Sequence, residues 1–127
     1  MTHKILYIED NPDSMRLIQR VLEPRGYKVY GAVNGFEGIS MAEEIKPDLI
    51  LVDINLPDID GYEVTRRIRT SQDSELHSVT IIALTANVLK GDAEKAIAAG
   101  CDAYLPKPVN IHELSARVGM YLSGDTG

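Results

Sequence analysis

The sequence predicts an α/β domain in which a doubly wound sheet of five parallel strands carries helices on both faces. Three observations indicate this fold. Short apolar or β-branched runs alternate with segments of helical periodicity. Three of the runs are almost wholly apolar, as strands buried on both faces of a sheet are. Residues that favour helix ends stand between the runs.

Five runs are expected to form the strands. The first, third and fourth are the most apolar and therefore belong in the centre of the sheet. The second contains Lys28 and Tyr30, and this mixed composition suits an edge strand. Ser71–Ser78, before the fourth run, is expected to be a polar loop. The runs are Lys4–Ile8, Tyr27–Val33, Asp48–Val52, Val79–Leu84 and Ala103–Leu105.

Five helices are expected from apolar residues that recur at helical spacing. Asn11 precedes Pro12, a pair that favours a capped helix start, and Asn110 can cap the last helix. Gly26 and Gly100 follow the first and fourth helices, where a left-handed residue often ends a helix. The apolar stripes are Ile18, Val21 and Leu22; Phe36, Ile39, Ala42 and Ile45; Tyr62, Val64 and Ile68; Ala93, Ala96 and Ile97; and Ile111, Leu114, Val118, Tyr121 and Leu122.

Length and composition bound the range of functions. The 127 residues suit one domain, with a core at about residues 3–122 and a flexible tail at 123–127. The net charge of −6 argues against a nucleic-acid-binding face, and the cluster of Arg66, Arg67 and Arg69 suits the solvated side of a helix. Apolar runs fall short of the roughly 20 residues of a membrane span. A lone cysteine and the lack of a visible export signal predict a cytoplasmic location.

Polar and charged residues stand where the predicted strands end. Glu9 and Asp10 follow the first strand, Asp53 the third, Thr85 the fourth and Lys107 the fifth. In a doubly wound sheet the functional site lies beyond the carboxyl ends of the strands. We therefore expect three carboxylates, one hydroxyl and one ammonium group at one edge of the sheet.

The chemistry of these groups favours a metal ion and a phosphoryl group. Crowded carboxylates repel one another unless a cation is bound, and Mg²⁺ accepts a few oxygen ligands while keeping several waters. A lysine and a threonine suit phosphoryl oxygens, and a carboxylate between them can become an acyl phosphate. Each residue also has an ordinary explanation: Asp10 as a cap, Thr85 as a turn hydroxyl, Lys107 as a surface charge, Gly61 as a helix start. Their joint placement carries the prediction.

Four pieces of sequence, in order and in their strand context, carry a resemblance to a known family. They are the pair Glu9-Asp10, the stretch DINLPDIDGYE at Asp53–Glu63, LTA at Leu84–Ala86, and Lys107-Pro108. Across nearly its whole length the chain resembles the receiver domain of bacterial two-component signalling. The resemblance implies the flavodoxin-like strand order 2-1-3-4-5 and a single receiver domain over residues 1–127.

The resemblance also assigns roles at the site. It implies that Asp53 is the phosphoacceptor, with Thr85 and Lys107 contacting the phosphoryl group, and that the Lys107–Pro108 peptide bond is cis. Ala86 leaves room for the phosphate, Asn87 tunes dephosphorylation, and Tyr104 is the aromatic residue that turns inward as Thr85 moves. The implied Mg²⁺ ligands are Glu9, Asp10, Asp53 and the backbone carbonyl of Asn55. Two departures from the family are Glu9 in place of an aspartate, which lengthens one ligand arm, and Leu56 in place of a methionine.

The function that follows is a phosphorylation switch and not an enzyme. A histidine kinase or a histidine phosphotransfer protein donates to Asp53. The surface of the fourth predicted helix, the fifth strand and the last helix then changes, and a downstream protein reads it. We expect a monomer or a phosphorylation-promoted dimer that binds neither nucleic acid nor membrane.

Two alternatives stay open. The chain could be a receiver module of a larger hybrid kinase or transcription regulator. More remotely, it could be a phosphohydrolase with an aspartate nucleophile. Such enzymes resemble the pattern D-x-D-x-T, in which the second aspartate is the general acid. Here Asn55 occupies that second position, and an amide cannot act as the acid. A nucleotide-binding module is disfavoured because the first strand lacks a Gly-rich turn after it. His3, His77 and His112 lack metal spacing, and Cys101 suits core packing.

Overall fold

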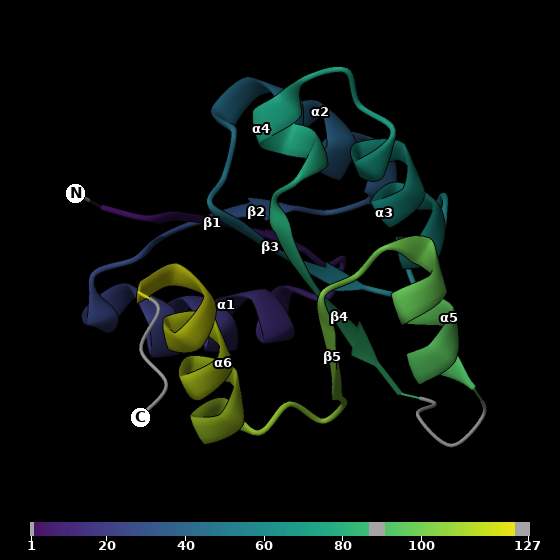
Figure 1. Ribbon diagram of the computed structural model, residues 1–127. Helices are drawn as coiled ribbons and strands as arrows, with labels where there is room; N and C mark the ends of the chain where they lie inside the picture. Colours follow the sequence, from purple (N-terminus) through teal and green to yellow (C-terminus); the bar gives the residue numbers. More distant parts are fainter. Residues whose placement is uncertain (1, 87–90, 124–127) are drawn as a thin grey trace.

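Five parallel strands form one sheet in the order β2-β1-β3-β4-β5, as expected (Figure 1). The computed structural model describes residues 2–86 and 91–123. The strands span β1 Lys4–Ile8, β2 Lys28–Ala32, β3 Leu49–Asp53, β4 Thr80–Thr85 and β5 Ala103–Pro106. Every residue of β3 is buried, which agrees with its central place in the sheet.

Helices cover both faces of the sheet. Figure 1 shows α1 and α6 below it and α2, α3 and α4 above it, and α5 packs on the same side as α3. The helices are α1 Pro12–Leu22, α2 Gly35–Ile45, α3 Gly61–Arg69, α4 Ser74–His77, α5 Asp92–Ala99 and α6 Ile111–Ser123; a 3₁₀ turn at Glu23–Arg25 follows α1. Among the described residues, none of the helices combines the length and apolar character needed to span a bilayer.

The core has two layers, one on each face of the sheet, because side chains alternate along each strand. In β1, Leu6 and Ile8 join the layer under α2, α3 and α5. Ile5 and Tyr7 join the layer under α1 and α6. The central strands therefore fix the positions of helices on both sides.

The predicted helix caps are confirmed. The Asn11 side chain accepts hydrogen bonds from the backbone N–H groups of the first turn of α1, and Asn110 does the same for α6. Gly26 and Gly100 have φ values of +95° and +111°, in the left-handed region that glycine adopts without strain. Each cap satisfies polar groups that the end of a helix leaves without partners.

One expectation about the helical segments was wrong, and another was right only in part. The polar loop Ser71–Ser78 contains the one-turn helix α4, which Asp73 caps and which buries Leu76 in the core. In α2 the predicted apolar stripe is right for Ala42, which is buried, and for Ile39 and Ile45, which pack against the core, but Phe36 is 52% exposed. Small residues face the sheet as well: a Cβ atom on Gly38 would overlap the Ile8 side chain. The helix packs too closely on β1 for a large residue there.

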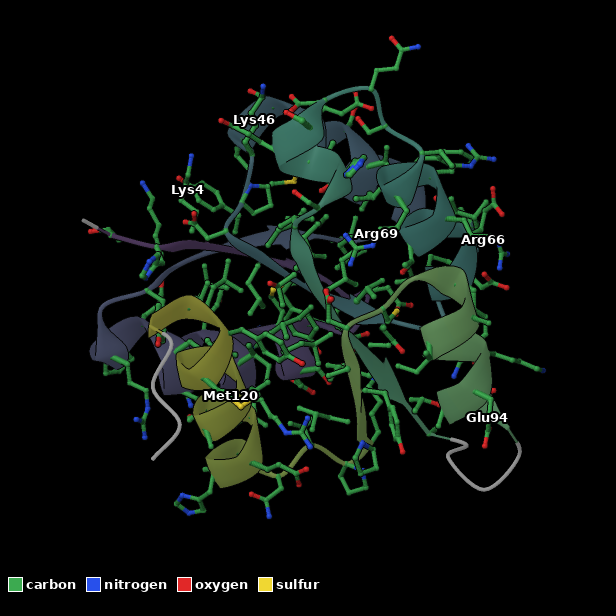
Figure 2. The ribbon with its side chains drawn as sticks, in the orientation of Figure 1. Lys4, Lys46, Arg66, Arg69, Glu94 and Met120 are labelled. Carbon is green, nitrogen blue, oxygen red and sulfur yellow. The ribbon has the colours of Figure 1, made fainter. Side chains whose placement is uncertain are left out.

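Arg69 ties three elements together on the upper face (Figure 2). From α3, its guanidinium group donates to the carbonyl oxygens of Val79 at 2.6 Å and Gly100 at 2.8 Å, and to the Asp102 carboxylate at 2.9 Å. The stripe of arginines was predicted to be solvated, and for Arg66 this is correct, since it points outward from the same helix. Arg69 is half-buried and serves the fold.

Candidate functional site

The carboxyl ends of β1, β3 and β5 bring three charged side chains into contact. Glu9 is 2% exposed and Asp53 is 3% exposed. The Lys107 ammonium group donates to Glu9 Oε1 at 2.9 Å and to Asp53 Oδ2 at 3.0 Å. One cation therefore bridges two buried carboxylates that follow or end separate strands. The strand-end argument predicted that these groups lie at one edge of the sheet.

Asp10 completes a group of three carboxylates. One oxygen each from Glu9, Asp10 and Asp53 lies within 4.8 Å of the others. Asp10 is exposed and the other two are buried, so the group opens to solvent on one side. Three negative charges face the single positive charge of Lys107. An oxygen-only donor set with excess negative charge fits a hard divalent cation.

Burial and mutual repulsion set the protonation of the pair. Burial raises the pKa of Asp53 to about 6, with the neighbouring Glu9 adding to the rise and Lys107 opposing it. Burial also acts to raise the pKa of Glu9, but hydrogen bonds from Lys107 and the Asn11 N–H outweigh it and hold this pKa below its usual value. The two carboxylates outweigh the effect of burial on Lys107, so its pKa lies above the usual value. The ammonium group is therefore charged, and Asp53 is the member that takes up a proton first.

The connection from β3 to α3 folds tightly around Asp53. The Asn55 N–H donates to Asp53 Oδ1 at 3.1 Å, and the Gly61 N–H donates to the Ile54 carbonyl at 2.9 Å. A Cβ atom on Gly61 would lie 2.6 Å from the Asp53 carbonyl oxygen, closer than real contacts permit. Gly61 thus does more than start a helix: it lets α3 begin directly behind Asp53.

Asp58 fastens this same connection to a second helix. Its carboxylate accepts from the N–H groups of Gly35 at 2.7 Å and Phe36 at 2.8 Å, which are the first donors of α2. Burial acts to raise the pKa of Asp58, and these hydrogen bonds outweigh it and lower the pKa. Sequence reasoning missed this contact, because a cap supplied by a residue 22 or 23 positions away leaves no local signal.

Three further predicted residues, Thr85, Ala86 and Tyr104, differ in their surroundings. Thr85 is buried at the end of β4, and its hydroxyl donates to the Asp92 carboxylate of α5 at 2.9 Å. Ala86 is exposed, and Asn87 lies outside the described residues. Tyr104 in β5 is half-buried and lines a surface hollow between α5 and α6.

The Lys107–Pro108 bond is cis, as the resemblance implied. Cys101 is buried, with its sulfur 3.5 Å from the Thr65 hydroxyl, which agrees with a packing role.

Tyr7 is a residue of the site that sequence reasoning missed: its hydroxyl donates to Glu9 Oε1 at 3.0 Å. The spacing of two along a strand, which puts Tyr7 and Glu9 on one face, was a usable signal.

Comparisons with known proteins agree with this geometry. A family model for the response regulator receiver domain matches residues 5–119. The polar-differentiation response regulator DivK of Brucella anthropi is 38% identical over 122 residues, which are 96% of this chain and 98% of that one.

Two solved structures are similar over nearly the whole chain. The receiver domain of sensor histidine kinase PA1611 from Pseudomonas aeruginosa, with a magnesium ion coordinated in its active site cleft, has a TM-score of 0.86 and 39% identity, covering 98% of this chain and 100% of that one. The co-crystal structure of the Saccharomyces cerevisiae phosphotransfer protein Ypd1 with the receiver domain of Ssk1 contains a chain with a TM-score of 0.85 and 31% identity, covering 94% of this chain and 88% of that one. From its sequence and its fold, this chain belongs to the response regulator receiver domain family of two-component signalling.

Proposed function

We propose that this chain is a phosphorylation switch in which Asp53 accepts a phosphoryl group. One observation carries the proposal: Lys107 bridges Asp53 and Glu9 inside a group of three carboxylates. A carboxylate placed between a cation site and an ammonium group has charge-neutralising partners on both sides of an incoming phosphoryl group. The rest of the chain supports this centre, and the chain is not itself an enzyme with an external substrate.

Mg²⁺ is the proposed cofactor. Glu9, Asp10 and Asp53 would hold it together with the backbone carbonyl of Asn55, and the oxygen-only donor set fits its preference. When bound, Mg²⁺ neutralises charge that develops on the phosphoryl oxygens. The magnesium ion in the PA1611 receiver domain supports the same assignment here.

In the proposed phosphoryl transfer, this chain supplies the nucleophile, Asp53, and the ammonium group of Lys107. A carboxylate oxygen of Asp53 attacks phosphorus, and the P–N bond to the donor histidine breaks as the new P–O bond forms. The pKa of about 6 leaves Asp53 ionised at neutral pH and so able to attack. Lys107 then exchanges one carboxylate partner for a phosphoryl oxygen and keeps the added charge paired.

The response begins at Thr85. Its hydroxyl leaves Asp92, its partner at 2.9 Å, and turns to a phosphoryl oxygen. Ala86 leaves room for the phosphate, and Asn87 tunes its loss. Tyr104 turns inward, and the surface of α5, β5 and α6 changes in a way that a downstream protein reads.

A histidine kinase or a histidine phosphotransfer protein is the proposed donor. The complex of Ypd1 with the Ssk1 receiver domain supports a donor of this kind. We propose that residues 1–127 act as one receiver domain, as a monomer or a phosphorylation-promoted dimer, in the cytoplasm. Neither nucleic acid nor membrane is a proposed partner.

Acetyl phosphate tests the acceptor. With Mg²⁺ it is expected to add one phosphoryl group to the wild-type chain, as measured by intact mass, and none to Asp53→Asn. Removing Mg²⁺ with EDTA should suppress the labelling. Asp13→Asn, which removes an exposed carboxylate of α1, is the matched control and should label normally. Equal labelling of Asp53→Asn and the wild type would end the assignment.

Lys107→Ala tests the proposed signalling role. Mg²⁺ binding should stay intact or strengthen, because a competing cation is removed from the carboxylates. The response at Tyr104 should weaken, because the phosphoryl group loses its ammonium partner. NMR chemical shifts near Tyr104, compared with and without phosphorylation, report the response. A variant that responds as strongly as the wild type would contradict the role of Lys107.

A further inference from the structure

Tyr7 places a buried hydroxyl beside the carboxylates. It lies in β1, and Glu9 follows directly after that strand, where its N–H still donates to the Ala32 carbonyl of β2. The spacing of two therefore puts both side chains on the same face of the sheet. The tyrosine side chain is 1% exposed and packs in the core layer under α1 and α6. Because this layer fixes the ring, the position of the hydroxyl is fixed too, 3.0 Å from Glu9 Oε1.

Three donors from different segments hold the Glu9 carboxylate. Oε1 accepts from the Tyr7 hydroxyl and from Lys107 Nζ, and Oε2 accepts from the Asn11 N–H at 3.2 Å. A carboxylate has about four acceptor positions. These donors therefore leave about one position for a cation, and they decide which way it points.

The Tyr7 hydroxyl lies within hydrogen-bonding reach of a glutamate side chain at position 9. An aspartate at position 9 would draw the carboxylate back by one carbon–carbon bond, about 1.5 Å. The contact with Tyr7, now 3.0 Å, would then exceed the usual length of a hydrogen bond. A phenylalanine at position 7 would remove one of the three donors and leave Oε1 of Glu9 with Lys107 as its remaining partner among these donors. Residues 7 and 9 are therefore suited to each other.

We propose that Tyr7 is a positioning residue for the cation site, and that its hydroxyl orients Glu9 so that this longer acidic side chain serves the site. This inference rests on the proposed function, because it requires Glu9 to take part in Mg²⁺ binding. A different role would be purely structural, with Glu9 satisfying a buried hydroxyl. That role would change the stability of the fold and leave the affinity for Mg²⁺ unchanged.

The test compares one substitution in two backgrounds. Mg²⁺ affinity is measured by titration calorimetry for the wild type, Tyr7→Phe, Glu9→Asp and the double variant. In the wild-type background, Tyr7→Phe should weaken Mg²⁺ binding by about tenfold or more, the usual effect of removing a residue that orients a metal ligand. In the Glu9→Asp background it should have almost no effect, because the shorter arm does not reach the hydroxyl. Such dependence on background is the mark of two residues that act together.

Tyr121→Phe is the matched control. Its hydroxyl donates to the Asp102 carbonyl at 3.3 Å, far from the carboxylates, and its removal should leave Mg²⁺ affinity unchanged. Equal losses from Tyr7→Phe in the two backgrounds, or no loss in the wild-type background, would overturn the inference. If the wild type binds Mg²⁺ and accepts a phosphoryl group at Asp53 in that case, only the inference fails. If the wild type does neither, the proposed function fails with it.

A measurement on the wild type keeps the inference testable if Tyr7→Phe does not fold. With ¹³C-labelled tyrosine, the carbon that bears the Tyr7 hydroxyl should shift as Mg²⁺ is added, because its acceptor changes charge environment. The midpoint of the shift should equal the Mg²⁺ dissociation constant, and the Tyr121 signal should stay in place. A Tyr7 signal that stays constant while the site fills with Mg²⁺ would rule out the positioning role.

Discussion

Removing the carboxylate of Asp53, the proposed acceptor, should stabilise the metal-free fold. A pKa raised from 3.8 to about 6 corresponds to about 3 kcal/mol of unfavourable charge in the folded state above pH 6. Glu9 has the opposite shift, so part of this cost is recovered within the pair. We expect Asp53→Asn to increase the free energy of unfolding by about 1–3 kcal/mol in EDTA at about pH 8, a rise of several degrees in Tm.

The pH dependence of this gain has a defined sign. The folded chain takes up a proton on Asp53 between about pH 6 and pH 3.8, where the unfolded chain is still ionised. The penalty in the wild type is therefore full above about pH 6 and relieved as the pH falls toward 3.8. The difference between Asp53→Asn and the wild type should shrink over the same range. Asp10→Asn should also stabilise the metal-free fold, by a smaller amount, because Asp10 is exposed.

Calorimetry with EDTA and with Mg²⁺ measures both effects. Mg²⁺ should stabilise the wild type by mass action, because the unfolded chain has no assembled site. It should stabilise the Asn variants less, because each of them lacks one of the proposed carboxylate ligands. Glu43→Gln, an exposed change on α2, controls for the general relief of a net charge of −6 and should stay within about 0.5 kcal/mol. An Asp53→Asn protein less stable than the wild type in EDTA under these conditions would show that the carboxylates do not repel one another as argued.

Two further substitution pairs test the fold around the site. Gly61→Ala should lower the free energy of unfolding by about 1–3 kcal/mol, because its Cβ would meet the backbone carbonyl of Asp53. Gly119→Ala has open space around its Cβ and should raise the free energy of unfolding by about 0.5–1 kcal/mol. Urea unfolding would show whether the two signs differ. Arg69→Ala should lower the free energy of unfolding by about 2–4 kcal/mol, because it removes the donor to the carbonyl oxygens of Val79 and Gly100. Arg66→Ala, which removes an exposed ion pair, should change it by no more than about 0.5 kcal/mol. Equal losses in the two variants would refute the role of Arg69.

Strand positions could be predicted because the core imposes a pattern on them. The first strand was predicted with the bounds that β1 has, and the others differ by one residue at one or both ends. The third and fourth strands extend one residue further than predicted, so that Asp53 and Thr85 are the last residues of β3 and β4. The helices were less predictable where small residues face the sheet, as Gly38 does in α2, because an apolar pattern does not register close backbone packing.

The contact between Lys107 and the two buried carboxylates could be predicted from strand ends alone, because parallel strands end at one edge. The contacts of Asp58 and Thr85 could not, because each joins segments whose distance depends on how helices pack. Tyr7 could have been found from its spacing to Glu9, since that spacing is a property of the strand itself. The roles that the resemblance assigns to the site residues, including those of Asn87 in phosphate loss and Asn55 in metal binding, stay predictions.

The order of the strands leaves two edges, and both are poor templates for further strands. At β2, the exposed Lys28 lies with its ammonium group 5.4 Å from the centre of the Tyr30 ring, which puts a charge along the edge. At the opposite edge β5 has four residues and ends at Pro106, which has no N–H to donate. Charged and short edge strands prevent sheets from adding to one another. Association with a second copy or with a partner should therefore use helical surfaces. Addition of strands to either edge of the sheet should be disfavoured, even when the helices change position.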